Sequence, residues 1–241
     1  MNNMQEVIEV LSNIPLFFTL LTIGIYLLFN VLQGKTGFIL FNPLLATTVV
    51  LIILLLVFNI PYETYQTGGG YLSILVTPAT VALAILLEKN WKYFKSNLAA
   101  ILTGAFVGVL TNAVLVVLIG VLLGLDQTMI ATILPKSITT AIAQPISESL
   151  GGIPALTVGI VVLTGLLGNA FGVPLLKALK ITDPIAQGNA LGGTSHAIGT
   201  SRAIELGDLQ GGIGGSSIVI SGLITVFVAP IAYNLAVSLF F

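Results

Sequence analysis

The stretch 189-NALGGTSHAIGTSRAIELG-207 decides the fold, because it is long enough for a membrane helix yet more polar than a lipid-facing helix should be. It contains a tandem hexapeptide, GTSHAI followed directly by GTSRAI, which carries His196 and Arg202. Successive residues of an α-helix are rotated by about 100°, so these two side chains would leave different faces of a continuous helix. The pair Gly192 and Gly193 predicts a helix break, since backbone groups freed inside a membrane need partners in protein or in a water-filled cavity.

The chain around this stretch is strongly apolar. Of its 241 residues, 56% are hydrophobic and 7% are charged, and the mean hydropathy is +1.09. Soluble domains are about 45–50% apolar and about 25% charged, so this composition excludes an ordinary soluble domain. The apolar runs are continuous and much longer than the ~10-residue alternating strands of a membrane β-barrel. The fold class is therefore an all-α polytopic membrane protein, with residues 1–241 forming a single transmembrane domain.

Charge and residue usage also exclude several functions. The net charge is −1 and the longest basic group is Lys89, Lys92 and Lys95, so we expect no nucleic-acid partner. The chain has no cysteine, which excludes thiolate catalysis, and its one histidine leaves a zinc site short of ligands. We expect no metal, no cofactor and no enzymatic activity.

The charged residues divide the chain into apolar runs, and a helix needs about 20 mostly apolar residues to cross the hydrocarbon layer. Two further stretches, 128–150 and 185–207, have helical length but are unusually polar. Together these runs predict about six to eight transmembrane segments, two of which are broken or re-entrant polar helices. The apolar candidates are 15–33, 43–60, 71–87, 98–123, 153–176 and 213–240.

Lysines indicate the orientation, because short cytoplasmic loops are enriched in Lys and Arg. Placing the three lysine-bearing loops inside makes 98–123 and 153–176 run in opposite directions. The stretch 128–150 must then enter the membrane and return to the same side, or it must contain two membrane crossings. Lys136 and Arg202 are the two basic residues that fall within the polar stretches. The three loops contain Lys35, then Lys89, Lys92 and Lys95, and then Lys177 and Lys180.

A second polar stretch, 134-LPKSITTAIAQPISESLGG-152, begins with Pro135, which predicts a helix break. Polar residues recur there every four positions, which predicts a polar stripe along one helix face. Lys136 has two interpretations: its ammonium neutralises a substrate carboxylate, or it reaches toward the membrane surface. The stripe consists of Lys136, Thr140, Gln144 and Glu148, with Ser137, Thr139 and Ser147 beside it.

The third informative stretch is 61–84. Pro78 with Thr80 predicts a helix break in which hydroxyls replace lost backbone bonds, and Gly68–Gly70 predicts a hinge or loop. Residues 77–84 and 134–143 share a Pro-x-[Ser/Thr] pattern. This similarity reflects either a duplicated half or the small residues that packed membrane helices share.

The segment 189–207 also has the groups that would bind an anion. Glycines let backbone approach a ligand, and helix amino termini offer N–H groups and positive potential. His196 is a candidate donor or titrating group, or it bridges neighbouring helices. Arg202 binds the same ligand, or it pairs with Glu205 as an interfacial anchor. The candidate binding groups are Asn189, Gly193, Thr194, Ser195, His196, Thr200 and Arg202.

Three motifs resemble those of the LrgB/CidB family of bacterial membrane proteins: 134-LPKSITTAIA-143, 150-LGGIPALT-157 and 192-GGTSHAIGTSRAIELG-207. That family is similar to the carboxyl-terminal part of the plastid glycolate/glycerate translocator. The strings 68-GGG-70 and 77-TPATVALA-84 occur in the expected order, so the resemblance covers essentially the whole chain.

The resemblance implies a multi-pass protein of the bacterial cytoplasmic membrane with inverted repeats and broken helices. It makes Pro135–Thr140 and Thr194–Thr200 binding elements, and it implies a small LrgA/CidA-like membrane partner. Bacterial members are described as holin-like or antiholin-like proteins that modulate murein hydrolase activity, autolysis and programmed cell death. Other relatives are implicated in transport of pyruvate or short 2-hydroxy monocarboxylates.

The residues favour a transporter, because polar groups beside helix breaks at two separated places are typical of a midplane binding site. Our hypothesis places a small carboxylate between 134–144 and 189–202, with proton coupling through His196, whose imidazole titrates near neutral pH. The rival is a holin-like or antiholin-like lysis regulator that acts through pore formation or partner binding. A homo-oligomer in the lipid bilayer is expected in either case.

Overall fold

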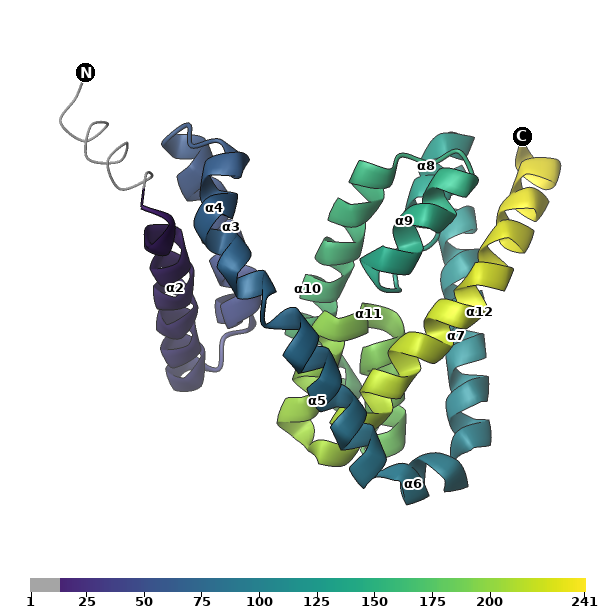
Figure 1. Cartoon of the computed structure of the whole chain (residues 1–241). Coiled ribbons are helices and arrows are strands. Elements are labelled where there is room, and N and C mark those ends of the chain that lie inside the picture. Colours follow the sequence, from purple (N-terminus) through teal and green to yellow (C-terminus); the bar gives the residue numbers. More distant parts are fainter. Residues whose placement is uncertain (1–13) are drawn as a thin grey trace. The chain divides into compact units, whose positions relative to one another are not determined.

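The computed structural model describes residues 14–241, apart from the side chains of Pro15, Val76 and Thr80, and this part of the chain contains helices and no strand (Figure 1). The all-helical prediction is confirmed. The chain forms two compact units, residues 1–82 and residues 83–241. The single transmembrane domain stays a prediction. In order, the helices are α2 (Pro15–Thr36), the 3-10 turn η1 (Ile39–Phe41), α3 (Pro43–Val57), α4 (Tyr62–Ser73), α5 (Val76–Lys89), α6 (Trp91–Ser96), α7 (Leu98–Leu122), α8 (Gln127–Ile133), α9 (Thr140–Ser149), α10 (Pro154–Ala178), α11 (Pro184–Leu206) and α12 (Asp208–Phe240).

Within residues 14–241, five helical stretches are long and apolar enough to cross a membrane. The predicted span at 43–60 is shorter than expected, because α3 has 15 residues and ends at Val57. A helix of that length rises about 22 Å, less than the ~30 Å of a hydrocarbon layer. The five candidate spans are Leu16–Thr36, Tyr62–Lys89, Leu98–Leu122, Pro154–Ala178 and Asp208–Phe240.

In the first unit, α2 packs against α3 and α4. Phe18 is buried at this contact, and its ring meets the ring of Tyr65 edge to face. The hinge predicted at Gly68–Gly70 is wrong, because these glycines lie inside α4. Gly68 is buried and its carbonyl accepts a hydrogen bond from Thr19 Oγ1 at 2.7 Å, which joins α4 to α2.

The helical run of residues 62–89 is interrupted at Ile74 and Leu75, between α4 and α5. Pro78 therefore lies in the first turn of α5, where a missing backbone N–H removes no helical hydrogen bond. The side chain of Thr80 lies outside the described part of the chain. The similar segments 77–84 and 134–143 adopt different structures, helix in the first and a turn leading into α9 in the second, so their likeness reflects shared small residues.

The second unit is built around α7 and α10, each of 25 residues, which run in opposite directions (Figure 1). Their bounds agree to within two residues with the predicted 98–123 and 153–176, because both apolar runs are free of charge. The longest helix, α12, packs against α11 and α7. A core of buried aliphatic side chains that includes Val116, Leu134 and Val161 joins α7, α8 and α10.

The continuous helix implied by the polar stripe at 134–152 is wrong. Residues 134–139 form a turn between α8 and α9, and Lys136 lies in that turn rather than on a helix face with Thr140. Pro135 directly follows the end of α8, as expected of a residue that cannot continue a helix. The two short helices thus form a hairpin whose tip is the turn at residues 134–139.

The helix α11 is broken, as the sequence predicted, but at Ser195 and His196 rather than at Gly192. His196 has a φ of 44°, and the chain folds back there, which divides α11 into a first limb, residues 184–194, and a second limb, residues 197–206. A Cβ on Gly199 would lie 3.2 Å from the carbonyl carbon of Leu191, which a continuous helix would hold about 12 Å away. Gly192 is helical and serves another purpose: a Cβ there would lie 2.7 Å from the Cα of Gly214 in α12.

Candidate functional site

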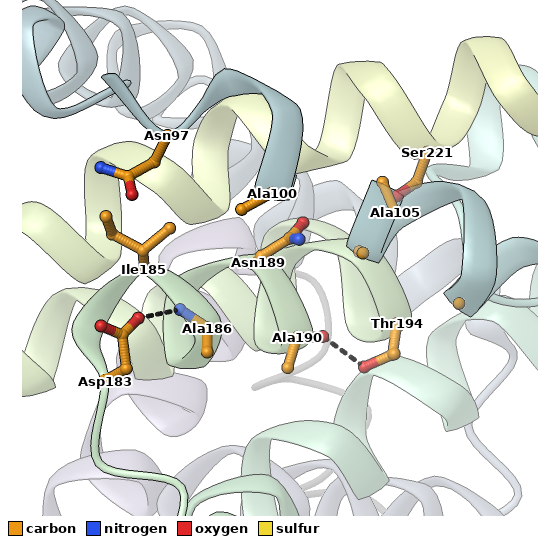
Figure 2. A pocket seen from close by; sticks show the side chains of 13 residues that line it. Asn97, Ala100, Ala105, Asp183, Ile185, Ala186, Asn189, Ala190, Thr194 and Ser221 are labelled. Carbon is orange, nitrogen blue, oxygen red and sulfur yellow. Dashed lines mark hydrogen bonds between the residues drawn. The ribbon is translucent and has the colours of Figure 1, made fainter. Parts of the chain in front are cut away.

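A cavity of about 520 Å³ lies between α7, the first limb of α11 and α12 (Figure 2). Its size is in the range of about 300–1,000 Å³ that small-molecule sites occupy. Small side chains form most of the wall, and hydroxyl and amide groups supply its polar part. The lining residues are Asn97, Ala100, Gly104, Ala105, Gly108, Asp183, Ile185, Ala186, Asn189, Ala190, Gly193, Thr194 and Ser221.

Ser221 is the most informative residue of this cavity. Its side chain is 1% exposed, and its Oγ has no hydrogen-bond partner among the described residues. A Cβ on Gly193 would lie 3.0 Å from this Oγ, so the glycine leaves space in front of the hydroxyl. Burying a hydroxyl without a partner is unfavourable by about 1–3 kcal/mol. A ligand or a water molecule in the cavity would satisfy this hydroxyl.

Asn189 holds the cavity wall together rather than pointing free groups into it. Its Nδ2 donates to the carbonyl of Ile101 in α7 at 3.1 Å, and its Oδ1 accepts from Ser217 Oγ in α12 at 2.8 Å. Gly104 makes room for this bridge, because a Cβ there would lie 2.5 Å from the Asn189 Nδ2. The predicted binding residue Asn189 therefore lines the cavity with both ends of its amide satisfied.

The two ends of the first α11 limb also border the cavity. At its start, the Asp183 carboxylate accepts a hydrogen bond from the Ala186 N–H at 2.8 Å and caps the helix. At its end, the exposed Thr194 hydroxyl donates to the carbonyl of Ala190 at 2.7 Å (Figure 2). Of the sequence-predicted binding residues, Asn189, Gly193 and Thr194 line the cavity.

The tip of the α8–α9 hairpin forms a second polar cluster. Lys136 Nζ donates to Ser137 Oγ at 3.3 Å, and Ser137 Oγ donates to Asn112 Oδ1 of α7 at 3.2 Å. Asn112 lies one helical turn, about 6 Å, beyond the cavity residue Gly108 along α7. Among the described residues no carboxylate pairs with Lys136, whose side chain is half-buried. Thr139 and Thr140 begin α9 beside this cluster and do not line the cavity.

The predicted residues at the break of α11 hold the two limbs in place. His196 is buried, and its Nε2 lies 3.0 Å from the carbonyl oxygen of Val161 in α10. Ser195 is buried against Gly168, and the buried Thr200 hydroxyl donates to the His196 carbonyl at 2.9 Å. The alternative interpretation of His196, a bridge between neighbouring helices, describes this geometry.

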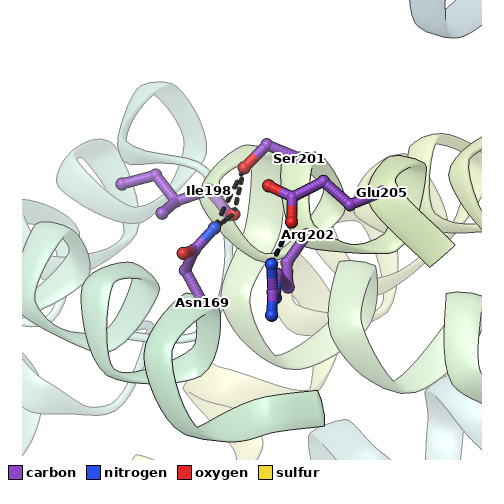
Figure 3. A network of polar contacts seen from close by, with 5 residues as sticks. All are labelled: Asn169, Ile198, Ser201, Arg202 and Glu205. Carbon is purple, nitrogen blue, oxygen red and sulfur yellow. Dashed lines mark hydrogen bonds and ion pairs between the residues drawn. The ribbon is translucent and has the colours of Figure 1, made fainter. Parts of the chain in front are cut away.

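The second limb of α11 is attached to α10 through Asn169 (Figure 3). Its Nδ2 donates to the carbonyl of Ile198 at 2.9 Å and to Ser201 Oγ at 3.1 Å. Arg202 forms an ion pair with Glu205 one turn away, which is the alternative interpretation of this residue. The structure thus separates Arg202 from the lining residues of the cavity.

Sequence reasoning missed Ser221, Asn112 and Asn169. The spacing of Ser217 and Ser221 by four positions places both on one face of α12, and this was the available signal. A serine in an apolar helix usually donates to a carbonyl of its own helix, as Ser217 does to Ile213 at 2.8 Å, so the residue type alone does not mark a site.

Lysines surround the end of the second unit at which the cavity begins. Lys95 lies two residues before the lining residue Asn97, and Lys180 lies three residues before Asp183. Lys92 lies with Lys95 in α6, and Lys177 lies in the last turn of α10. An excess of lysine at this end favours the approach of anions.

Long apolar helices, a broken polar helix and a cavity with an unpartnered hydroxyl define a helical membrane protein with an internal polar site. Residues 22–235 match the LrgB-like family, and the chain belongs to that family. It is 38% identical over 198 residues to proteins named "Antiholin-like protein LrgB" from Bacillus mycoides (strain KBAB4) and Bacillus cereus (strain B4264), covering 82% of this chain and 86% of each relative. No solved structure matches the chain. The resemblance stated from the motifs is therefore confirmed, and the family is one of antiholin-like membrane proteins rather than of enzymes.

Proposed function

We propose that the chain is a secondary carrier of small monocarboxylates, such as pyruvate, glycolate or similar 2-hydroxy and 2-oxo acids, in the bacterial cytoplasmic membrane. The observation that carries the proposal is the buried hydroxyl of Ser221, which lies in the apolar helix α12 and lines the cavity. This hydroxyl has no hydrogen-bond partner among the described residues. A solute with hydrogen-bond acceptors would satisfy it.

Lys136 supports the anionic character of the solute. Its side chain is half-buried and has no carboxylate partner among the described residues. It is linked through Ser137 to Asn112, which lies about one helical turn beyond the cavity residue Gly108. A desolvated ammonium is unfavourable without an anion nearby. The positive charge of Lys136 near the cavity would favour an anion over a neutral solute.

A repeated architecture supports the carrier interpretation. The helices α7 and α10 are antiparallel, and two residues beyond the end of each lies a residue with positive φ, Gly124 at 70° and Lys180 at 57°. Each is followed by an aspartate that caps the next helix at 2.8 Å, Asp126 and Asp183. The hairpins that follow occupy equally long stretches, 127–149 and 184–206. Inverted repeats with broken helices that meet at the membrane midplane are typical of secondary transporters.

Each long helix also carries an asparagine that holds its own hairpin. Asn112 Nδ2 donates to the carbonyl of Leu134 at 3.0 Å, and Asn169 Nδ2 donates to the carbonyl of Ile198 at 2.9 Å. These two asparagines lie 57 positions apart, as do Asp126 and Asp183. In this proposal both hairpins are re-entrant, enter from opposite membrane faces and end near the middle, which agrees with six to eight transmembrane segments.

His196 and the partner complete the proposal. His196 attaches the tip of α11 to Val161, and a change in its protonation would alter that attachment, which is how protons would couple to transport. We include a small LrgA/CidA-like membrane protein and a second copy of this chain as partners in the assembled carrier.

Uptake into proteoliposomes tests the proposal. Labelled pyruvate, lactate and glycolate are offered to the purified chain, with and without the LrgA-like partner, and saturable uptake is expected. Ser221→Ala removes one hydrogen bond to a charged ligand and should raise KM about tenfold or more. Ser238→Ala is the matched control, because that serine lies near the end of the same helix and donates to Leu235. The absence of uptake for every carboxylate would overturn the proposal, and uptake retained in His196→Ala would remove the role of the histidine.

The second candidate function is a regulator of murein hydrolase activity and autolysis, favoured by the name that the Bacillus relatives carry. A pore would release dyes and ions without saturation, whereas a carrier saturates and exchanges its solute. The same proteoliposomes, loaded with a fluorescent dye, distinguish the two functions.

A further inference from the structure

The two repeats contact each other's long helix at equivalent positions. Asn189, in the first limb of α11, donates to Ile101 of α7. Thr132 lies 57 positions before Asn189, in α8, and its carbonyl oxygen is 3.0 Å from Thr157 Oγ1 of α10. Thr157 lies 56 positions after Ile101. The contact between α11 and α7 therefore has a counterpart between α8 and α10.

The two contacts differ in what lies beside them. The contact between Asn189 and Ile101 borders the cavity that α7, the first limb of α11 and α12 line, whereas the contact between α8 and α10 is closely packed. At the counterpart, Thr132, Ser147 and Thr157 are each 0% exposed, and we call these three residues the closed seam. Thr157 Oγ1 lies 2.7 Å from Ser147 Oγ, and the N–H of Ile153 donates to Thr132 Oγ1 at 2.9 Å. A Cβ on Gly152 would lie 2.8 Å from the backbone nitrogen of Thr132, so no space is left for a solute.

The closed seam is polar, although an aliphatic contact would seal a membrane helix equally well. Hydroxyl groups that bond to one another when dry can bond to water when separated, so parting them leaves no group unsatisfied. The seam therefore has the chemistry of a contact that opens.

We infer that the closed seam is the second gate of the translocation path, which opens when the cavity between α7 and α11 closes. If the two inverted repeats exchanged their conformations, the seam would open and the cavity would close. The same small anion would then enter from the opposite end of the second unit, where Asp126 and Glu148 lie. This inference rests on the carrier part of the proposed function and not on the identity of its solute.

Single cysteines test the inference, because the chain contains no cysteine of its own. Ala131→Cys places a thiol beside the closed seam, at a residue that is 0% exposed. Ala190→Cys is the matched variant, since that alanine lines the cavity. In sealed, oriented vesicles an impermeant maleimide should label position 190 from the side of Lys180 and, more slowly, position 131 from the other side.

A reversible cross-link supplies the second measurement. Ser147→Cys with Thr157→Cys replaces two oxygens 2.7 Å apart, a separation close enough for a disulfide. When this pair is combined with Ala131→Cys, oxidation should abolish maleimide labelling at position 131, measured by peptide mass spectrometry. A reductant should restore the labelling. The control carries Ser147→Cys without Thr157→Cys and should label equally with and without oxidant.

Two results would overturn the inference. One is labelling at position 131 that is unchanged by the disulfide, and the other is a reduced protein that transports solute while position 131 never reacts. If position 131 shows the expected exchange while no carboxylate is taken up, the second gate stands and the proposed solute class is wrong.

Discussion

Replacing Gly192 with alanine tests the packing that brings the broken helix against α12. The added Cβ would lie 2.7 Å from the Cα of Gly214 and would overlap its carbonyl oxygen. An ordinary contact begins near 3.4 Å, so backbone rather than a flexible side chain must move by several tenths of an ångström. Overpacking of this kind destabilises by about 1–3 kcal/mol.

The matched variant is Gly159→Ala in α10, where nothing lies within 4 Å of the added Cβ. Alanine is favoured over glycine in a helix by about 1 kcal/mol, so this variant should be neutral or stabilised. The two variants should therefore differ by about 1–4 kcal/mol. With about 2–4 °C per kcal/mol, the Tm of Gly192→Ala in detergent should fall about 2–16 °C below that of Gly159→Ala. Equal Tm values for the two variants would refute the close contact between α11 and α12.

Three further changes address separate parts of the second unit. Asn169→Ala removes the donor to Ile198 and Ser201 and should lower the free energy of unfolding by about 1–3 kcal/mol, measured by thermal unfolding; an unchanged Tm would contradict the role of this side chain. Arg202→Gln breaks a partly exposed ion pair and should change stability by less than about 1 kcal/mol; uptake should remain, and its loss would return Arg202 to the binding site. Gly108→Ala adds a methyl group to the cavity wall where nothing lies within 4 Å, so folding should be retained while KM for the solute rises in the uptake assay.

The membrane helices followed from the sequence where apolar runs are long and end at polar residues or proline. The helix α7 begins after Asn97 and α10 begins at Pro154, both within one residue of the predicted start. The break in α11 was predicted from its composition but was placed at Gly192 rather than at His196. Its position depends on a tertiary contact, because the imidazole of His196 is bound to Val161, which lies 35 positions away.

The candidate site was less accessible to sequence reasoning. Gly193 and Thr194 were found because hydroxyls and glycines stand out in an apolar chain. Ser221 was not found, because its hydroxyl differs from that of Ser217 only in lacking a partner, which depends on the space left by Gly193. Lys136 was assigned to a helix stripe because the four-residue periodicity continues across the turn at residues 134–139.

The capped helix and hairpin at residues 98–149 and 154–206 have a consequence for the origin of the chain. A unit that crosses the membrane once and whose hairpin returns to the face it entered ends on the opposite face from its start. A tandem gene duplication of such a unit therefore inserts its second copy upside down without any rearrangement. After duplication, the two copies can diverge where each contacts the long helix of the other, with Asn189 at this contact in one copy and Thr132 in the other. The aspartate caps at residues 126 and 183 keep equivalent positions in both copies.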